Sequence, residues 1–348
     1  MQLNYSNPQH PLSSPETKTR KPRLHMLCLS PLGTRSRQLF IPRLLKIYLF
    51  RWEICLSEKQ MLVVFLSSLC VSCRMQCPRA GNFECSVTKL KFEMRSGGTL
   101  TYMYSSWDQH LGKAEMQDWM AAGPLFNIQA DASGKVATIH LPLFICLKGR
   151  KTDISQIKIA HFLDVGMTVE EPTRMSPFHV VLENPTFSFL GVLCKSMYRL
   201  FHFFPIHSVV QLYQSSRTAS LHLYVIPNDS SLIQAIKDEE EKHHSMLVQK
   251  RPQTDEPLYF GSHYVVRSST DLKINPEELE FSYQNPGQLQ SFVEICVGKE
   301  GRIELSLRKK ENLCSVWDAW LEPGIYSQME YFLLADTRQL CKEELKSF

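Results

Sequence analysis

The sequence lacks the short motifs that mark the common enzyme sites. It has no glycine-rich phosphate loop, no G-x-S-x-G nucleophile turn and no H-E-x-x-H zinc motif. Cys70, Cys73 and Cys77 lie close together, but no Cys or His pair follows at the spacing of a zinc site. A conventional small-molecule enzyme is therefore not indicated, and we expect neither a cofactor nor a metal ion.

Strong net charge and long apolar runs are also missing. The net charge is only +4, and residues 1–75 hold 11 Lys and Arg against 3 Asp and Glu. The rest of the chain is therefore mildly acidic, which disfavours nucleic acid as a partner. The apolar run 61–71 is shorter than the about 20 residues that a membrane-spanning helix needs. We expect no membrane insertion, with a receptor anchored by this run as the less favoured alternative.

The cysteines do not form a disulfide framework of the secreted kind. There are 11 of them, an odd number at irregular spacing, whereas such frameworks are usually even and compact. We therefore expect mostly reduced thiols and a cytoplasmic protein. With 43% hydrophobic and 21% charged residues, most of the chain is expected to be globular.

From about Cys77 the chain is a succession of short segments separated by turn residues. Many of these segments alternate apolar and polar residues, as half-buried strands do. Strands are expected over 87–94, 99–105, 125–130, 136–141, 178–183, 208–214, 220–226, 263–268, 279–284, 292–297, 303–308 and 314–320. This pattern predicts a mainly β protein built of antiparallel β-sandwiches. One helix is expected over 231–243, with Ser231 as its N-cap and Gln234 as the capping-box partner.

Segment 178–194 combines a strand, a stiff turn and an aromatic–serine pair. Asn184-Pro185 ends the strand, and Phe187-Ser188 follows directly. Proline fixes its own φ and pushes the preceding residue towards extended geometry. Such a turn is able to hold the Phe187–Ser188 peptide bond in a strained form.

Short motifs spread over residues 77–323 resemble one known family. They are Pro78-Arg79-Ala80-Gly81, Ser106-Trp107-Asp108-Gln109, Ala122-Gly123-Pro124-Leu125, His140-Leu141-Pro142, Ala160-His161-Phe162, Val181-Leu182-Glu183-Asn184-Pro185, Phe187-Ser188, Leu221-His222-Leu223-Tyr224, Ala235-Ile236-Lys237-Asp238, Ser282-Tyr283 and Val316-Trp317. Together they resemble the function-to-find domain of inflammasome sensors, a tandem of a ZU-like and a UPA-like β-sandwich. Each tetrapeptide alone is a weak match, and the set is a strong one.

The resemblance implies a domain organisation. Residues 77–187 correspond to the ZU-like sandwich and residues 188–323 to the UPA-like sandwich. Residues 1–76 precede this match and are expected to be disordered or not native to the fold. Residues 324–348 resemble the opening of a caspase-recruitment domain, and they are too few for a complete one.

The resemblance also implies a reaction and its residues. In the family the chain cuts itself at the junction of the two sandwiches, so Ser188 corresponds to the nucleophile and Phe187 supplies the attacked carbonyl. A serine hydroxyl needs a base, and the family's essential histidine corresponds to His161. Asp164 is a candidate to orient that ring. His179 is nearer to Ser188 in sequence and is a second, weaker candidate base. Such a protein is a single-turnover intramolecular serine autoprotease rather than an ordinary enzyme.

The family context implies a regulatory role in innate immunity, apoptosis and pyroptosis. The expected partners are related inflammasome sensors, other UPA-like halves and cytosolic dipeptidyl peptidases. The alternative is a scaffold or decoy of related sensors that keeps the fold without cleaving. One band or two on a denaturing gel distinguishes these alternatives.

Overall fold

The computed structural model describes residues 51–322, apart from 58–59, 68–69, 113–117, 149–153, 164–165, 196–203, 216, 249–251 and 298–301. Within them the chain is mainly β, and α2 (Ser230–Lys242) is the one α-helix of this part of the chain. The expected mainly β architecture with a single helix is therefore confirmed. No helix among the described residues is long and apolar enough to cross a membrane.

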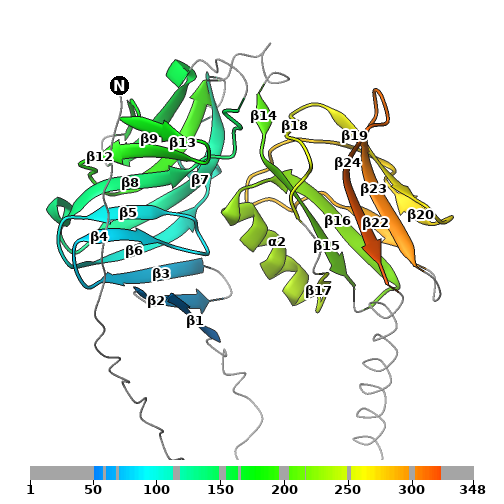
Figure 1. The fold of residues 1–348 in the computed structure, drawn as a ribbon, viewed down its shortest axis with the longest axis horizontal. Helices are drawn as coiled ribbons and strands as arrows, with labels where there is room; N and C mark the ends of the chain where they lie inside the picture. The colour runs from blue at the N-terminus through cyan, green and yellow to red at the C-terminus, as the bar shows by residue number, and fades with distance from the viewer. Residues whose placement is uncertain are drawn as a thin grey trace, which may run out of the picture. The chain divides into compact units, whose positions relative to one another are not determined.

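The first half forms two antiparallel sheets (Figure 1). The larger has the strand order β1 (Arg51–Ser57), β2 (Gln60–Ser67), β3 (Cys70–Cys77), β6 (Gly98–Ser105), β7 (Trp119–Ala130), β13 (Phe189–Lys195), β9 (Ile157–Leu163) and β10 (Gly166–Glu170). The smaller has the order β11 (Arg174–Ser176), β12 (His179–Glu183), β8 (Val136–Pro142), β5 (Lys91–Met94) and β4 (Gly81–Glu84). Buried side chains of both sheets share one core, as the contact between Phe92 and Tyr102 illustrates.

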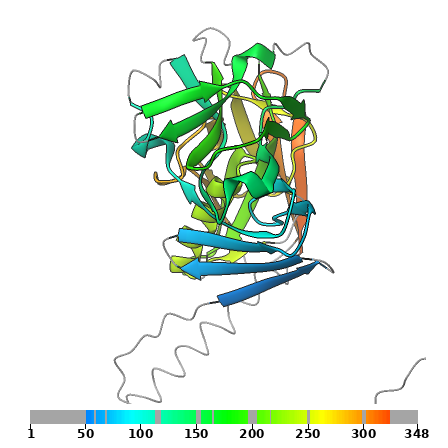
Figure 2. The same cartoon turned by 90° about the vertical axis from the view of Figure 1, so that its left-hand side faces the viewer.

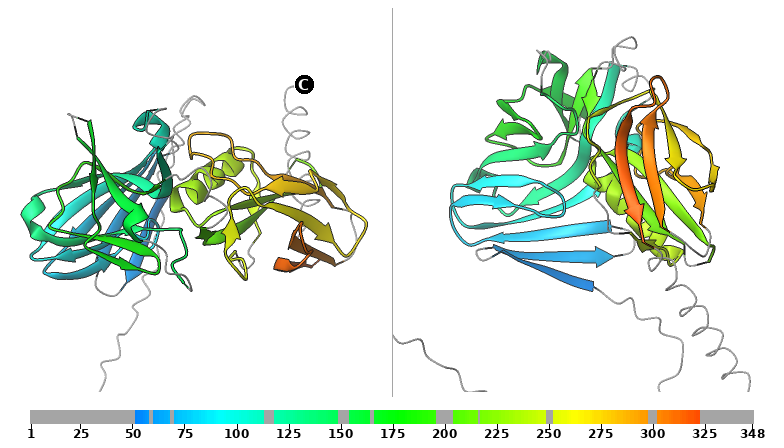
Figure 3. Two further views of the ribbon diagram at one scale, coloured as in Figure 1. Left: turned by 90° about the horizontal axis from the view of Figure 1, so that it is seen from above. Right: turned by 45° about the vertical axis from the view of Figure 1, so that its right-hand side comes forward.

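The second half also forms antiparallel sheets. One has the order β17 (Met246–Leu247), β15 (Ser208–Gln214), β16 (Ser220–Pro227), β22 (Val293–Cys296) and β20 (Lys273–Asn275). The other has the order β21 (Glu278–Glu280), β19 (His263–Ser268), β23 (Ile303–Lys309) and β24 (Ser315–Leu321), and its last two strands are drawn in orange in Figure 3. A short pair, β14 (Pro205–Ile206) with β18 (Leu258–Tyr259), completes this half.

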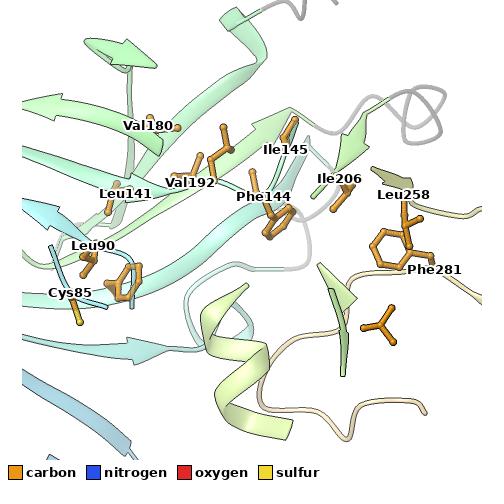
Figure 4. Close-up of a cluster of buried hydrophobic side chains, with 14 of the residues drawn as sticks. Cys85, Leu90, Leu141, Phe144, Ile145, Val180, Val192, Ile206, Leu258 and Phe281 are labelled. Atoms are coloured by element: carbon orange, nitrogen blue, oxygen red, sulfur yellow. The ribbon is translucent and has the colours of Figure 1, made fainter. Parts of the chain in front are cut away.

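The cores of the two halves are continuous. Ile145, which follows β8, forms an isolated bridge with Ile206 in β14, and the Phe144 ring packs on Phe260. Backbone hydrogen bonds from Cys146 N to Pro205 O and from His207 N to Phe144 O, both 2.7 Å, flank the bridge. Figure 4 shows this continuity, with Phe144 and Ile145 lying between Val192 on one side and Ile206 on the other.

The N-terminal segment 1–76 departs from its expected disorder in its described part. Strands β1, β2 and β3 extend the larger sheet beyond β6, as the blue strands of Figure 2 show. In β3 the side chains of Cys73, Met75 and Cys77 are buried, whereas Arg74 and Gln76 are exposed. This alternation fixes the face that β3 presents to the core. Residues 1–50 and the tail 324–348 lie outside the described residues.

The strand after Ser188 belongs to the first half. The sequence places the boundary between the two sandwiches at 187/188, but β13 lies between β7 and β9 in the larger sheet. Its residues Leu190, Val192 and Leu193 are fully buried there. The Phe187–Ser188 bond therefore precedes the last strand of the first sandwich rather than the first strand of the second.

Helix α2 begins one residue earlier than expected, and its N-cap is Asp229 rather than Ser231. The Asp229 carboxylate accepts hydrogen bonds from the backbone N–H of Ser231 at 2.8 Å and of Leu232 at 3.4 Å. Aspartate is as good an N-cap as serine, and here it satisfies two amides that have no partner within the helix. Gln234 instead bonds the Asp238 carboxylate at 2.7 Å, one turn further on.

Candidate functional site

The Phe187–Ser188 bond lies in a short crossover, residues 184–188, that carries the chain from β12 in the smaller sheet to β13 in the larger one. Both ends of the crossover are held by backbone hydrogen bonds. Asn184 N donates to Ala137 O at 2.8 Å, and Ile128 N donates to Ser188 O at 2.8 Å. The Phe187 side chain is half-buried against the shared core. The bond is thus part of a bridge between two sheets rather than of a free surface loop.

The pairing of β13 with β9 brings the crossover residue Ser188 towards His161 in β9. β13 pairs with β9 so that Phe189 lies opposite Phe162 and Leu190 lies opposite His161. Ser188 therefore stands two residues before the partner of His161. Because side chains alternate between the faces of a sheet, these two positions face the same side. The Ser188 hydroxyl donates a hydrogen bond to Phe162 O at 2.5 Å.

His161 is held in one orientation by a carboxylate. Its side chain is 2% exposed, and its Nδ1 lies 2.9 Å from Oε1 of Glu170 in β10. A carboxylate accepts hydrogen bonds, so Nδ1 carries the proton and Nε2 of the neutral ring keeps its lone pair. Nε2 is buried and has no hydrogen-bond partner among the described residues. A buried acceptor without a partner is rare in folded proteins and marks a candidate site.

Of the other two candidates from the sequence, only His179 is among the described residues. Asp164 lies outside the described residues, and the described carboxylate that contacts His161 is that of Glu170. His179 is in β12, in the smaller sheet, where its Nε2 lies 2.9 Å from Lys89 O. Burial lowers the pKa of His179. The sequence analysis missed Glu170, because only the β9–β10 hairpin brings it beside His161.

An aromatic cluster covers the other face of this part of the sheet. The buried ring of Trp107 packs edge-on against Phe162, with 6.2 Å between centroids, and the ring of His110 lies 4.2 Å from that of Phe189. Trp107 Nε1 donates to Gly123 O at 3.0 Å. The residues next to His161 and Ser188 are therefore fixed from both faces of the sheet.

The Trp107 ring lies so close to Gly191 in β13 that residue 191 has no room for a side chain. A Cβ atom at residue 191 would stand 2.5 Å from the Trp107 ring and 3.1 Å from Leu125. We expect Gly191→Ala to lower the free energy of unfolding by about 1–3 kcal/mol, as overpacking of a close-packed core does. Urea unfolding followed by tryptophan fluorescence measures this. Gly134→Ala is the control, because a Cβ there meets no atom within 4 Å. Equal stability of the two variants would contradict the packing described here.

The chain is thus a tandem of antiparallel β-sandwiches, with a serine at an inter-sheet crossover, a buried histidine on β9 and a half-buried carboxylate on β10 that holds the histidine. Comparison with known families agrees with this description. The "Function to find" model matches residues 68–200, and the "UPA-FIIND domain" model matches residues 206–321. The chain belongs to the function-to-find family. These matches also place the boundary between the two domains after β13.

Curated relatives share this region. NACHT, LRR and PYD domains-containing protein 1b allele 1 of Mus musculus is 38% identical over 255 residues, which is 72% of this chain and 20% of that protein. Caspase recruitment domain-containing protein 8 of Homo sapiens is 38% identical over 251 residues, which is 71% of this chain and 47% of that protein. The rat NACHT, LRR and PYD domains-containing protein 1a allele 1 is 40% identical over 255 residues, 72% of this chain and 21% of that protein. The chain thus spans less than half the length of these relatives.

Proposed function

We propose that this chain is a self-cleaving regulatory module that breaks its own Phe187–Ser188 bond. One observation carries the proposal: on the strand that pairs with β13, Glu170 fixes the buried His161 ring through Nδ1, and Nε2 has no partner in the described part of the chain. The carboxylate and the imidazole are thus arranged as in serine nucleophile sites, and contact between His161 Nε2 and the Ser188 hydroxyl would complete the relation that activates such a serine.

The reaction has two steps. His161 Nε2 accepts the proton of the Ser188 hydroxyl, whose oxygen attacks the Phe187 carbonyl carbon. The C–N bond then breaks, the serine nitrogen takes the proton from His161, and an ester joins Phe187 to Ser188 Oγ. Water hydrolyses the ester, which leaves a carboxylate at Phe187 and a free amine and hydroxyl at Ser188. Glu170 stabilises the imidazolium that forms between these proton transfers.

One rearrangement precedes the first step. The Ser188 hydroxyl donates to Phe162 O, so its proton is directed away from His161. Rotation about the Cα–Cβ bond of Ser188, or one intervening water, redirects it. In unreacted sites the hydrogen bond between nucleophile and base is often long or poorly aligned, and it tightens as the reaction proceeds.

The two fragments are expected to stay together after cleavage. The C-terminal fragment begins at Ser188 and carries β13, which is paired on both sides by strands of the N-terminal fragment. Separation would break two ladders of hydrogen bonds and expose the fully buried Leu190 and Val192. Burial of apolar surface on this scale strongly favours association.

Asp108 supplies a polar contact between the fragments outside β13. Its carboxylate accepts hydrogen bonds from Asn285 Nδ2 at 2.5 Å and Gln288 Nε2 at 3.5 Å, both in the second half. We expect Asp108→Ala to lower the urea concentration at which the cleaved fragments separate on size-exclusion chromatography. The effect is modest, about 1 kcal/mol, because the contacts are exposed. Asp318→Ala is the control, since the Asp318 carboxylate bonds Ser315 within β24. An unchanged midpoint in Asp108→Ala would refute this contact's role.

At the level of the cell, the family supports a role in innate immune and cell-death signalling of the inflammasome type. We propose a cytoplasmic module in which the C-terminal fragment is held by the N-terminal one. On release it would associate with other UPA-like halves or related sensors. Cytosolic dipeptidyl peptidases are the further partners that the family resemblance suggests.

A non-cleaving scaffold is the second candidate function, and one contact favours it. The Ser188 hydroxyl bonds a backbone carbonyl rather than the imidazole, as an ordinary structural serine does. Purified protein analysed on a denaturing gel decides between the two functions. Two bands support self-cleavage, and one full-length band after long incubation supports the scaffold.

A further inference from the structure

Arg95, which follows β5, reaches across to the start of the crossover. Its Nη1 donates to Val136 O at 2.7 Å and to Gly134 O at 3.3 Å. Its Nη2 donates to the side-chain Oδ1 of Asn184. The backbone is tied as well, because Arg95 N donates to Lys135 O at 2.7 Å. One guanidinium therefore links the start of β8 and the turn before it to the residue that begins the crossover.

Asn184 has an unusual backbone conformation. Its φ is +51°, in the left-handed region that most side chains avoid and that asparagine and aspartate tolerate. Its amide donates to Ala137 O at 2.8 Å, so both its backbone and its side chain are held. Asn184 lies three residues before the Phe187 carbonyl, and Ser188 is fixed at the far end of the crossover through Ile128.

We propose that Arg95 and Asn184 are positioning residues for cleavage, setting where the crossover begins and hence where the Phe187 carbonyl stands relative to Ser188 Oγ. This inference rests on the proposed self-cleavage. Pro185 and the short distance between the two anchors leave the crossover few conformations. A change in the backbone dihedral angles of Asn184, or loss of its contact with Arg95, therefore displaces the Phe187–Ser188 bond. Small displacements of reacting atoms lower rates steeply.

Three substitutions of Asn184 separate its two features. Asn184→Asp keeps an acceptor for Arg95 and tolerates positive φ. Asn184→Gly keeps the conformation and removes the acceptor. Asn184→Ala removes the acceptor and disfavours the conformation. We expect cleavage near the wild-type rate for the first, about tenfold slower for the second and slower still for the third.

The rate is measured on the full chain by pulse-chase in a cell-free translation reaction, as the first-order conversion of full-length protein into two fragments. Arg95→Gln is expected to match Asn184→Gly. Arg267→Gln is the control, because Arg267 pairs with Glu277 on the exposed surface of the second half. The pH at half-maximal rate is expected to be the same in all variants, because positioning leaves the His161–Ser188 chemistry unchanged. Urea midpoints of the uncleaved proteins, each carrying Ser188→Ala, report whether the fold is intact.

Each outcome separates the positioning role from the cleavage itself. A wild-type chain that does not cleave removes the proposed function and this inference with it. A wild-type chain that cleaves, with Asn184→Gly and Arg95→Gln cleaving equally fast, overturns the inference and leaves the function standing. The inference is also overturned if Asn184→Asp cleaves as slowly as Asn184→Gly, or if the slow variants have lowered urea midpoints. The slow cleavage then reflects general destabilisation.

Discussion

Ser188→Ala is expected to leave a single full-length chain under conditions in which the wild type is fully cleaved. The substitution removes the only atom proposed to attack the Phe187 carbonyl, and it loses one hydrogen bond, from the hydroxyl to Phe162 O. The expected effect is complete loss of fragments on a denaturing gel. The fold should survive, because one half-buried side chain is merely shortened.

Ser188→Cys is the matched variant for this experiment. A thiol makes the same acyl shift, so cleavage is expected to persist. Added hydroxylamine should then speed the release of fragments, because it attacks the thioester that the cysteine forms. Fragments that persist in Ser188→Ala would point to an external protease, and the self-cleavage mechanism would be wrong.

His161→Gln is expected to slow cleavage by at least about 100-fold, the usual contribution of a positioned base. Glutamine is similar in size and polar, but it takes up no proton near neutral pH. Glu170→Gln is expected to slow cleavage about tenfold or more, because a neutral amide no longer stabilises the imidazolium and is able to donate to Nδ1. Pulse-chase rates across pH 5–9 measure both variants.

His179→Gln is the control for these two variants, since His179 bonds Lys89 O in the other sheet. Its rate should equal that of the wild type. A fast His161→Gln chain would contradict the assignment of the base. If His179→Gln alone were slow, the weaker of the two candidates would be the base.

Many strands of both halves were predictable from sequence, and two strands beside the candidate site were not. Strands such as β15, β19 and β23 alternate or stand between clear turn residues, and they lie close to the expected ranges. β9 and β13 were missed. In β13 the residues from Leu190 to Cys194 are all buried, because the sheet has side chains packed on both faces there. A strand buried on both faces has no alternation of polar and apolar residues to detect.

The candidate site was predictable only in part, for a related reason. Ser188 and His161 came from motifs of the family, and the pairing of β13 with β9 places Ser188 two residues before the partner of His161. Glu170 belongs to no motif that the sequence analysis used. Its role depends on the register of the β9–β10 hairpin, in which Thr168 lies opposite His161. Nearness in sequence favoured His179, but strand register decides which side chains meet.

The most direct test of the account is the intact mass of the purified wild-type chain, measured after denaturation in 6 M guanidinium and compared with the same sample under native conditions. The account predicts two masses, for residues 1–187 and 188–348, with Ser188 as the new amino terminus. It also predicts a single native complex and a cleaved fraction that does not depend on protein concentration. A single full-length mass, unchanged over days and across pH 5–9, would contradict the account and leave the scaffold as the function.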